Sequence, residues 1–213
     1  MKTVLVTGGA GYIGTTLIPL LLERDYNVTV FDSLLLGGDA LLPFFRHKNF
    51  HFIKGDIRDK DALRQAVKDK GVIIHLAAIV GFPACSENPD LAYSTNVEGT
   101  RNLAILVKKN QYILFGSTGS NYGAVLNGIC TEETPLNPLS VYGKTKTEAE
   151  RILLENTSVT AFRFATAFGV SPKLRLDLLI NDLTYQALKQ KYLVIYESSF
   201  MRTFIHVDRK SVV

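Results

Sequence analysis

Short apolar runs alternate along the chain with longer stretches that mix apolar and polar residues. The short runs are rich in β-branched and aromatic residues and predict six strands, at residues 3–7, 27–32, 50–54, 72–76, 112–117 and 159–164. The stretches between them are helix-like and predict helices at residues 12–24, 59–70, 89–109 and 141–156. Strands that alternate with helices are typical of an α/β fold, here a doubly wound parallel sheet with helices on both faces.

The most informative motif joins the first predicted strand to the first predicted helix. Residues 7–14 have the sequence Thr-Gly-Gly-Ala-Gly-Tyr-Ile-Gly, which places Gly8, Gly11 and Gly14 where the strand turns into the helix. Glycines in this turn let the backbone approach a pyrophosphate, which the free N–H groups and the positive dipole end of the helix then bind. Glycines also mark ordinary turns, but here the strand, the helix and a later acidic residue occur in the required order. The motif therefore predicts a dinucleotide-binding domain of the Rossmann type.

Asp32 is that acidic residue, and it ends the second predicted strand about 20 residues past the glycines. A carboxylate at this place accepts hydrogen bonds from the hydroxyls of the adenosine ribose and repels a 2′-phosphate. No Arg or Lys follows in residues 33–36 to pair with such a phosphate. We therefore expect the cofactor to be NAD rather than NADP. The alternative for Asp32 alone is a turn residue at a strand end.

The composition allows one large core and excludes several classes of protein. The chain has 213 residues, of which 46% are hydrophobic, and its net charge of +4 is scattered rather than gathered into the basic face that nucleic acids require. Cys85 and Cys130 have no spacing typical of a disulfide framework or a zinc site, so we expect free thiols and no metal. No apolar run reaches the roughly 20 residues of a membrane helix, and no signal-peptide cleavage pattern follows the first strand. We expect a cytoplasmic protein.

A second constellation carries the candidate chemistry. Tyr142 and Lys146 lie four residues apart in the last predicted helix and project from one face. A tyrosine is a poor base at neutral pH, but a nearby ammonium lowers its pKa by favouring the phenolate. Thr118, with Ser117 second, follows the fifth predicted strand, where a hydroxyl can donate to a substrate oxygen. The alternatives are a chance Tyr-x-x-x-Lys pair and a simple Ser/Thr-rich turn, and the preceding dinucleotide motif favours a catalytic site.

With these residues in place, the chain resembles the extended branch of the short-chain dehydrogenase/reductase superfamily, the NAD-dependent epimerase/dehydratases of nucleotide sugars. The resemblance covers residues 1–207 and includes the glycine turn, residues 55–59 and residues 75–78. It implies that Thr118, Tyr142 and Lys146 are the catalytic residues, with Tyr142 and Lys146 also contacting the cofactor. It further implies a set of residues that line the cofactor besides the glycines and Asp32: Tyr12, Ile13, Asp56, Ile57, Leu76, Ala77, Ala78, Asn96 and Ser117.

The resemblance also suggests where a substrate is bound. Arg202 falls in a segment that supplies an arginine to the substrate diphosphate, although an exposed arginine in a strand is as often merely solvated. Thr166 stands where the family usually has Asn, and Phe168 where it usually has Tyr, which leaves the sugar open. Residues 119–120 are Gly-Ser where dehydratases carry an Asp-Glu pair, so the resemblance disfavours a 4,6-dehydratase.

The expected function is epimerisation of a nucleotide-linked sugar, by transient oxidation to a keto intermediate and re-reduction on the same NAD. A reductase or dehydrogenase of the same family, a non-catalytic NAD-binding regulatory protein and an inert fragment are the alternatives. A sensor has no need of a phenolate base, so Tyr142 and Lys146 favour an enzyme. The resemblance also implies a homodimer paired through residues 89–109 and 141–156. His75 and His206 lie in apolar strands, where we expect packing rather than catalysis.

The pattern becomes less regular after residue 164. It predicts a turn at residues 169–172, a helix over residues 176–189, and short strands at residues 193–196 and 203–207. We expect residues 1–170 to form the NAD-binding domain and residues 171–213 the beginning of an incomplete substrate-binding lobe. The last six residues, 208–213, show no helical pattern, and they equal the translation of a common short-read sequencing adapter. We therefore expect this tail to be an artefact of read-through into the adapter.

Overall fold

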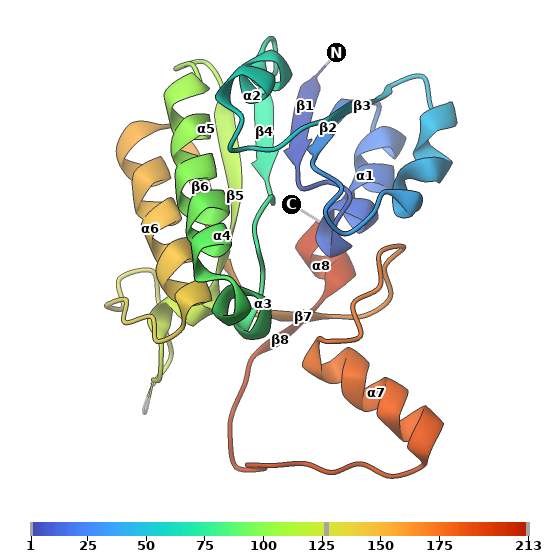
Figure 1. Ribbon diagram of the computed structural model, residues 1–213, viewed down its shortest axis with the longest axis vertical. Helices are drawn as coiled ribbons and strands as arrows, with labels where there is room; N and C mark the ends of the chain where they lie inside the picture. The colour runs from blue at the N-terminus through green and yellow to red at the C-terminus, as the bar shows by residue number, and fades with distance from the viewer. Residues whose placement is uncertain (1, 126–127, 212–213) are drawn as a thin grey trace.

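The computed structural model of the protein describes residues 2–125 and 128–211. Its centre is a six-stranded sheet in the order β3-β2-β1-β4-β5-β6, and every neighbouring pair is parallel (Figure 1). This is the predicted doubly wound α/β fold. The strands are β1 (Thr3–Thr7), β2 (Asn27–Asp32), β3 (Phe50–Lys54), β4 (Val72–His75), β5 (Tyr112–Thr118) and β6 (Val159–Phe164). All six lie where the sequence pattern predicts them, with one-residue differences at the ends of β4 and β5.

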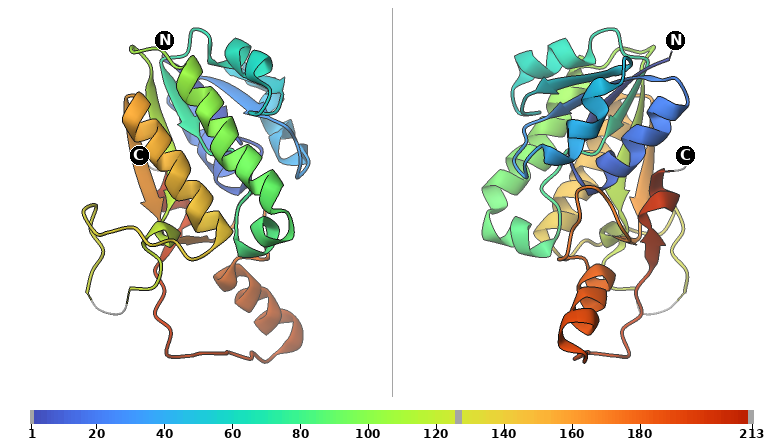
Figure 2. Two further views of the ribbon diagram at one scale, coloured as in Figure 1. Left: turned by 60° about the vertical axis from the view of Figure 1, so that its left-hand side comes forward. Right: turned by 90° about the vertical axis from the view of Figure 1, so that its right-hand side faces the viewer.

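Helices cover the two faces of the sheet unequally, as the views in Figure 2 show. One face carries α2 (Lys60–Val67), α5 (Thr100–Leu106) and α6 (Val141–Asn156), which pack on Leu5, Ile73 and Ile113. The other face carries α1 (Tyr12–Glu23) and the 3₁₀ helix η1 (Asp39–Arg46), which pack on Val4, Val28 and Ile74. Because side chains alternate along a strand, neighbouring residues of one strand contribute to two separate cores.

The predicted helix at residues 89–109 is interrupted. It consists of α4 (Pro89–Tyr93), a π-helical turn at Ser94–Gly99, and α5. This turn contains Asn96, whose side chain is buried and bonds to the loop after β4. The sequence pattern does not predict two short helices, α3 (Phe82–Glu87) and the 3₁₀ turn η3 (Gly119–Tyr122), because each is shorter than two helical turns.

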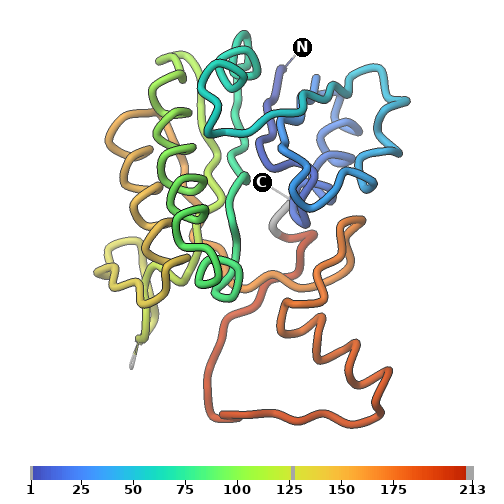
Figure 3. The backbone as a smooth tube through the Cα atoms, viewed as in Figure 1, coloured from blue at the N-terminus to red at the C-terminus, as the bar shows by residue number. Residues whose placement is uncertain are grey.

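The C-terminal part of the chain differs most from the sequence-based expectation. It contains a separate two-stranded parallel sheet, β7 (Thr166–Phe168) and β8 (Phe204–His206), together with α7 (Leu179–Gln190). The strand predicted at residues 193–196 is wrong: these side chains are exposed, and the tube in Figure 3 shows this segment passing outside the body of the fold with no strand alongside. The expectation of no helix after residue 207 is also wrong, because α8 (Val207–Ser211) is helical. Residues 212–213 of the tail lie outside the described residues.

The C-terminal segment is fastened to the start of α1. The Tyr12 hydroxyl donates to the carbonyl of Gly169 at 2.6 Å, and the Ser171 hydroxyl donates to the carbonyl of Tyr12 at 2.7 Å. Val207, at the start of α8, is completely buried in a small apolar cluster with Tyr12 and Ala167. The helix that follows the glycine turn therefore shares its packing with the first elements of the predicted substrate lobe.

A buried and an exposed leucine test this assignment of the core. Leu153 of α6 is completely buried against the sheet, whereas Leu188 of α7 is 68% exposed. We expect Leu153→Ala to lower the free energy of unfolding by about 2–5 kcal/mol, because it leaves a cavity beneath the helix. Leu188→Ala, the matched control, should change it by less than about 0.5 kcal/mol. Urea denaturation of both variants measures the difference, and equal losses would contradict the packing of α6.

Candidate active site

The glycine turn has the close contacts that its sequence predicts. Gly8 has a φ of +72°, and a Cβ there would lie 2.5 Å from the backbone nitrogen of Ala77. A Cβ at Gly14 would lie 2.5 Å from the carbonyl oxygen of Gly9, within the turn itself. The Gly8 N–H donates to the Phe31 carbonyl at 3.0 Å, which ties the turn to β2. Only glycine fits at these two positions, so the turn brings its backbone close to the ends of both neighbouring strands.

The N-terminus of α1 is left open toward this edge of the sheet. Its first residue follows Gly11, and no side chain caps it, whereas Asp59 caps α2 and Ser140 caps α6. A Cβ at Gly11 would meet only the Gly8 carbonyl oxygen, at 3.2 Å. Uncapped N–H groups beside an open backbone are the donors that a pyrophosphate needs, so the residues present fit a dinucleotide. Tyr12 and Ile13 provide the first N–H groups of this helix.

Asp32 ends β2 directly beside the turn. One of its carboxylate oxygens accepts the N–H of Ala10 at 3.0 Å, and the other accepts the N–H of Leu34 at 2.8 Å. Both oxygens keep a further lone pair for a ligand hydroxyl. The side chain is therefore held in one orientation by the backbone of the turn it serves, which suits recognition of a ribose.

Residues 55–59, which the resemblance places along the cofactor at the adenine, lie partly at the surface and partly in the core. The Asp56 carboxylate binds the Arg58 guanidinium at 2.6 Å, and this pairing holds the pKa of the Asp56 carboxyl below its usual range. Ile57 is buried in the core, where it packs against Gly99. Only the backbone of Ile57 is therefore left to contact a base, while the Asp56 carboxylate lies at the surface.

Residues at the end of β4 also face in different directions. The backbone of Ala77 lies against the glycine turn, and Ala78 follows it, but the Leu76 side chain lines an apolar groove behind the turn. Asn96 is buried, accepts the N–H of Ile79 at 2.8 Å, and donates to the Ile79 carbonyl at 3.0 Å and to Thr145 at 3.1 Å. Asn96 thus holds the loop after β4 against α6, a contact that sequence alone did not predict.

Thr118, Tyr142 and Lys146 come together at the carboxyl end of β5. Ser140 caps α6, which places Tyr142 in the first turn of the helix and Lys146 one turn later. Burial raises the pKa of the Tyr142 hydroxyl to about 12, and a hydrogen bond with the Thr118 side chain opposes this rise. A phenolate at Tyr142 therefore needs positive charge nearby, and Arg175 acts on this hydroxyl in that direction.

Lys146 lies buried one turn after Tyr142 in α6. Its side chain is 2% exposed, its ammonium nitrogen lies 3.9 Å from the centre of the Phe115 ring, and burial lowers its pKa to about 7. His75 lies nearby, and burial together with the Lys146 charge lowers its pKa to about 3. The neutral His75 ring bonds to Thr7 at 2.6 Å and to Thr100 at 3.0 Å, so this histidine packs in the core, as expected.

The sequence pattern did not identify three residues near the site: Glu150, Arg163 and Arg175. Glu150, one turn past Lys146, is buried and binds Arg163 of β6 at 2.7 Å. The Ser117 hydroxyl donates to this same carboxylate, so Ser117 points toward Glu150. Arg175, paired with Asp177, lies close enough to Tyr142 and Tyr12 to lower the pKa of both hydroxyls. The four-residue spacing from Lys146 to Glu150 is the one sequence signal that could have found the cluster.

The residues assigned to a substrate lie on the small sheet. Thr166 begins β7, and its N–H donates to the Thr203 carbonyl at 3.1 Å. Arg202 precedes β8, is exposed, and forms no hydrogen bond or ion pair within the described part of the chain. Both therefore occupy the C-terminal segment that Tyr12 fastens to the cofactor-binding helix.

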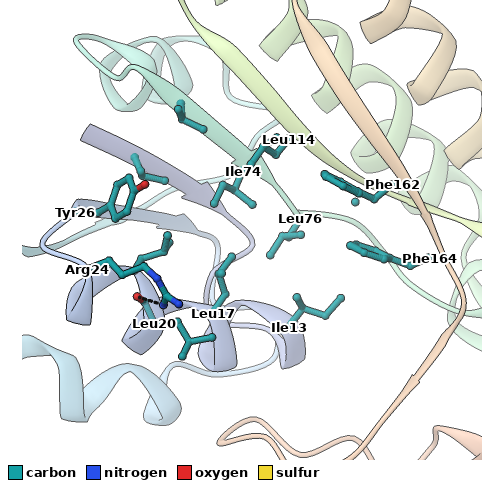
Figure 4. A pocket seen from close by; sticks show the side chains of 14 residues that line it. Ile13, Leu17, Leu20, Arg24, Tyr26, Ile74, Leu76, Leu114, Phe162 and Phe164 are labelled. Atoms are coloured by element: carbon teal, nitrogen blue, oxygen red, sulfur yellow. Dashed lines mark hydrogen bonds between the residues drawn. The ribbon is translucent and has the colours of Figure 1, made fainter. Parts of the chain in front are cut away.

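An apolar groove of about 200 Å³ lies on the α1 face of the sheet, away from the polar residues above (Figure 4). Ile13 and Leu17 of α1 face Ile74, Leu114 and Phe162 of the strands across it. Without hydrogen-bonding groups that converge inside it, the groove has no candidate chemistry. None of the described helices is long and apolar enough to cross a membrane, and no group of three metal-ligating side chains occurs among the described residues.

An open glycine turn, an acidic strand end, and a tyrosine one helical turn before a buried lysine define a class, the dinucleotide-binding α/β proteins with an acid–base site. Residues 4–208 match the NAD dependent epimerase/dehydratase family, and the chain belongs to this family. This membership confirms the predicted family and its cofactor, NAD.

Relatives and solved structures agree with this membership. The chain is 33% identical over 214 residues to the low-salt glycan biosynthesis protein Agl12 of Haloferax volcanii, a match of 96% of this chain and 69% of that protein. It is 36% identical over 162 residues to UDP-glucose 4-epimerase 2 of Oryza sativa subsp. japonica, or 71% of this chain and 40% of that protein. The structure of UDP-glucuronic acid 4-epimerase from Bacillus cereus, with UDP-glucuronic acid and NAD, superposes with a TM-score of 0.89 at 28% identity, over 99% of this chain and 71% of that one.

The burial of Lys146 predicts a cost in stability that a substitution should remove. The pKa of Lys146 is about 7 in the folded chain and 10.5 in the unfolded chain, so the unfolded chain binds the extra proton between these values. The cost is absent above pH 10.5 and grows as the pH falls to 7. We expect Lys146→Met to raise the free energy of unfolding at pH 7 by more than about 1.4 kcal/mol, the equivalent of one pKa unit.

Urea denaturation between pH 7 and 10.5 measures this gain, which should shrink as the pH rises. Lys144→Met is the matched control, because Lys144 is an exposed residue of the same helix. A gain that is equal in both variants, or that does not depend on pH, would contradict the assigned burial of the Lys146 ammonium.

Proposed function

We propose that the chain is the NAD-binding and catalytic part of an epimerase that acts on a nucleotide-linked sugar. The observation that carries this proposal is the meeting of Thr118, Tyr142 and Lys146 beside an uncapped glycine turn. The names of the rice and Bacillus cereus relatives, both 4-epimerases of UDP sugars, support it. The chain spans 40% and 71% of these two proteins, so we propose their kind of activity for this chain and do not take it from the comparison.

NAD, when bound, accepts a hydride from a sugar carbon and later returns it. The glycine turn holds its pyrophosphate through the first N–H groups of α1, and Asp32 holds its adenosine ribose. Tyr142, as phenolate, accepts the proton of the sugar hydroxyl during oxidation, and returns it during re-reduction. Thr118 donates a hydrogen bond to the same oxygen, and Lys146 contacts the nicotinamide ribose while its charge stabilises the phenolate. Protons and hydride both return to the sugar, so the cycle requires no external reductant.

The charges around Tyr142 bear on when this residue can act as a base. Burial is the main cause that raises the pKa of Tyr142 to about 12, so the phenolate depends on cations around it. Arg175 is one such cation and lowers the pKa of Tyr142, and Lys146, one turn later in the same helix, is proposed as a second. The positively charged nicotinamide ring of NAD adds a third. Tyr142 thus becomes a base chiefly when the cofactor is present, which restricts proton removal to the loaded enzyme.

A reductase or dehydrogenase of the same family would use the same three residues, and a regulatory protein would use only the cofactor half. The Tyr–Lys pair argues against a purely regulatory protein, since NAD binding does not require it. Thr166 and Arg202 remain the proposed substrate contacts, and the sugar is left open. A 4,6-dehydratase is disfavoured, because Gly119 and Ser120 carry no carboxylate for the elimination of water.

A homodimer through α5 and α6 accompanies this proposal. The two helices pack side by side, and Ile105 and Leu154 on them are exposed apolar residues. Pairing of two copies would remove this apolar surface from water.

Retention of NAD tests the cofactor half. We expect the purified chain to retain NAD through gel filtration and Asp32→Ala to lose it, because the ribose loses its acceptor and the turn loses the bond to Ala10. Release of nucleotide on denaturation measures the retained amount. Glu23→Ala, which removes an exposed carboxylate of α1, is the matched control and should retain NAD. Equal retention of NAD by the two variants would show that Asp32 does not contribute to NAD binding.

Substitution of the tyrosine tests the chemistry. We expect Tyr142→Phe to lower turnover of a UDP sugar by about 10²- to 10⁴-fold, since it removes the acid–base group, and to leave NAD retention intact. Tyr112→Phe, at the opposite end of β5, is the control and should keep full turnover. Interconversion of the two sugar epimers, followed by chromatography, is the measurement. Normal turnover by Tyr142→Phe would refute the proposed mechanism.

A further inference from the structure

Glu150 is a buried carboxylate for which the proposed chemistry has no role. It lies in α6 two turns after Tyr142 and one turn after Lys146, and only 2% of its surface is exposed. Burial of a carboxylate is costly unless it is paired and fully hydrogen-bonded. Its four donors come from three other places in the chain, so Glu150 joins elements that are distant in sequence.

The two carboxylate oxygens have separate sets of partners. One oxygen accepts Nε and Nη2 of Arg163 in β6, at 2.9 and 2.7 Å. The other accepts the hydroxyl of Ser117 and Nδ2 of Asn121, the latter at 2.9 Å. The same Asn121 nitrogen also bonds to the Ser117 hydroxyl at 3.0 Å, which closes a small buried network.

This network encloses the residue assigned to the substrate oxygen. Ser117 directly precedes Thr118, and Asn121 follows it in the 3₁₀ turn η3. Glu150 therefore holds both ends of the turn that carries Thr118, and it does so from the helix that carries Tyr142. Twenty-three residues separate Thr118 from Tyr142 in sequence, so the distance between their hydroxyls depends on non-covalent contacts such as this bridge.

Glu150 is also the carboxylate that acts on the Lys146 ammonium. The other ionisable groups that interact with Lys146 are the buried thiol of Cys85 in α3 and the ring of His75 in β4, which stays neutral. The Phe115 ring of β5 lies against the ammonium on another side. Arg163, across the carboxylate, adds a positive charge that Glu150 offsets. Loss of the Glu150 charge would therefore remove a negative charge near the buried Lys146 ammonium and leave the partly buried Arg163 guanidinium without its ion pair.

We propose that Glu150 is a positioning residue: its hydrogen bonds fix the Thr118 turn against the helix that carries Tyr142, and its negative charge, one helical turn from Lys146, favours the ammonium form of that lysine. This role rests on the proposed function, because it gives Lys146 and Thr118 the tasks assigned to them there. An ion pair that only stabilised the fold would leave kcat unchanged in a Glu150 variant that still folds.

Protonation of Lys146 can be measured without turnover. In protein labelled with ¹³C at the lysine ε carbons, the Lys146 signal is identified by its loss in Lys146→Met, and its chemical shift is followed with pH. We expect a midpoint of about 7 in the wild-type chain. Glu150→Gln should lower this midpoint by about one pH unit or more, because an opposite charge is removed at helical i,i+4 spacing. A midpoint that stays at the wild-type value would overturn the proposal.

Two further variants control this experiment. Glu155→Gln removes a carboxylate of the same helix that is exposed, and should leave the midpoint unchanged. Glu150→Asp keeps the charge on a shorter side chain, and should also keep the midpoint near the wild-type value. This variant decides the question if Glu150→Gln does not fold: a midpoint lowered in Glu150→Asp would overturn the assigned role of the charge.

Turnover tests the second half of the role. We expect Glu150→Asp to lower kcat for a UDP sugar by about tenfold or more, with KM changed less, since a displaced Thr118 weakens an interaction made in the transition state. Unchanged kcat in Glu150→Asp would overturn the positioning of the turn. If the wild-type chain turns over no nucleotide sugar, the proposed function fails, and the ¹³C titration still decides whether Glu150 holds the Lys146 charge.

Discussion

Parallel pairing of β1 with both β2 and β4 is the constraint on which the arrangement of the site depends. Parallel strands end at the same edge of a sheet, so the residues that follow them become neighbours despite long separations in sequence. The N–H of Gly8 bonds to the end of β2, and the N–H of Leu76 bonds to Thr7 at the end of β1. The glycine turn, Asp32 and Ala77 therefore surround one opening, toward which the N-terminus of α1 points its free N–H groups. A shift of register at either pairing would separate the turn from its acidic partner.

Burial of ionisable groups shapes the second half of the site. Burial raises the pKa of Tyr142 and lowers that of Lys146, so it opposes the charged form of both. Further charges nearby are therefore needed to favour the phenolate and the ammonium. Glu150 contributes negative charge on the lysine side, and Arg175 contributes positive charge on the tyrosine side. The environment of the pair therefore extends over four elements of the fold, α6, β5, β6 and the segment before α7.

The two faces of the sheet have different relations to function. The face covered by α2, α5 and α6 provides α6, which carries the proposed catalytic residues Tyr142 and Lys146, and the network around Glu150. The α1 face holds the cofactor turn at one end and an apolar groove along β5 and β6 (Figure 4). The first residues of α1 also anchor β7 and α8 through Tyr12 and Val207. The proposed cofactor site and the predicted substrate lobe thus both contact the first turn of α1.

The sequence by itself determined the elements whose signal is local. The six strands, α1, α6, the glycine turn, Asp32 and the Tyr142–Lys146 spacing all follow from short-range periodicity or from backbone space that only glycine leaves. Tertiary structure decided the partners of polar side chains and the direction of apolar ones. Asn96 bonds to Ile79 through a π-helical turn, Ser117 points to Glu150, and Ile57 enters the core. Residues 193–196 have a strand-like composition but no neighbouring strand, so they stay irregular. In each case the outcome depends on which group packs against the residue in the folded chain. That group is distant in sequence, so the local sequence pattern does not predict it.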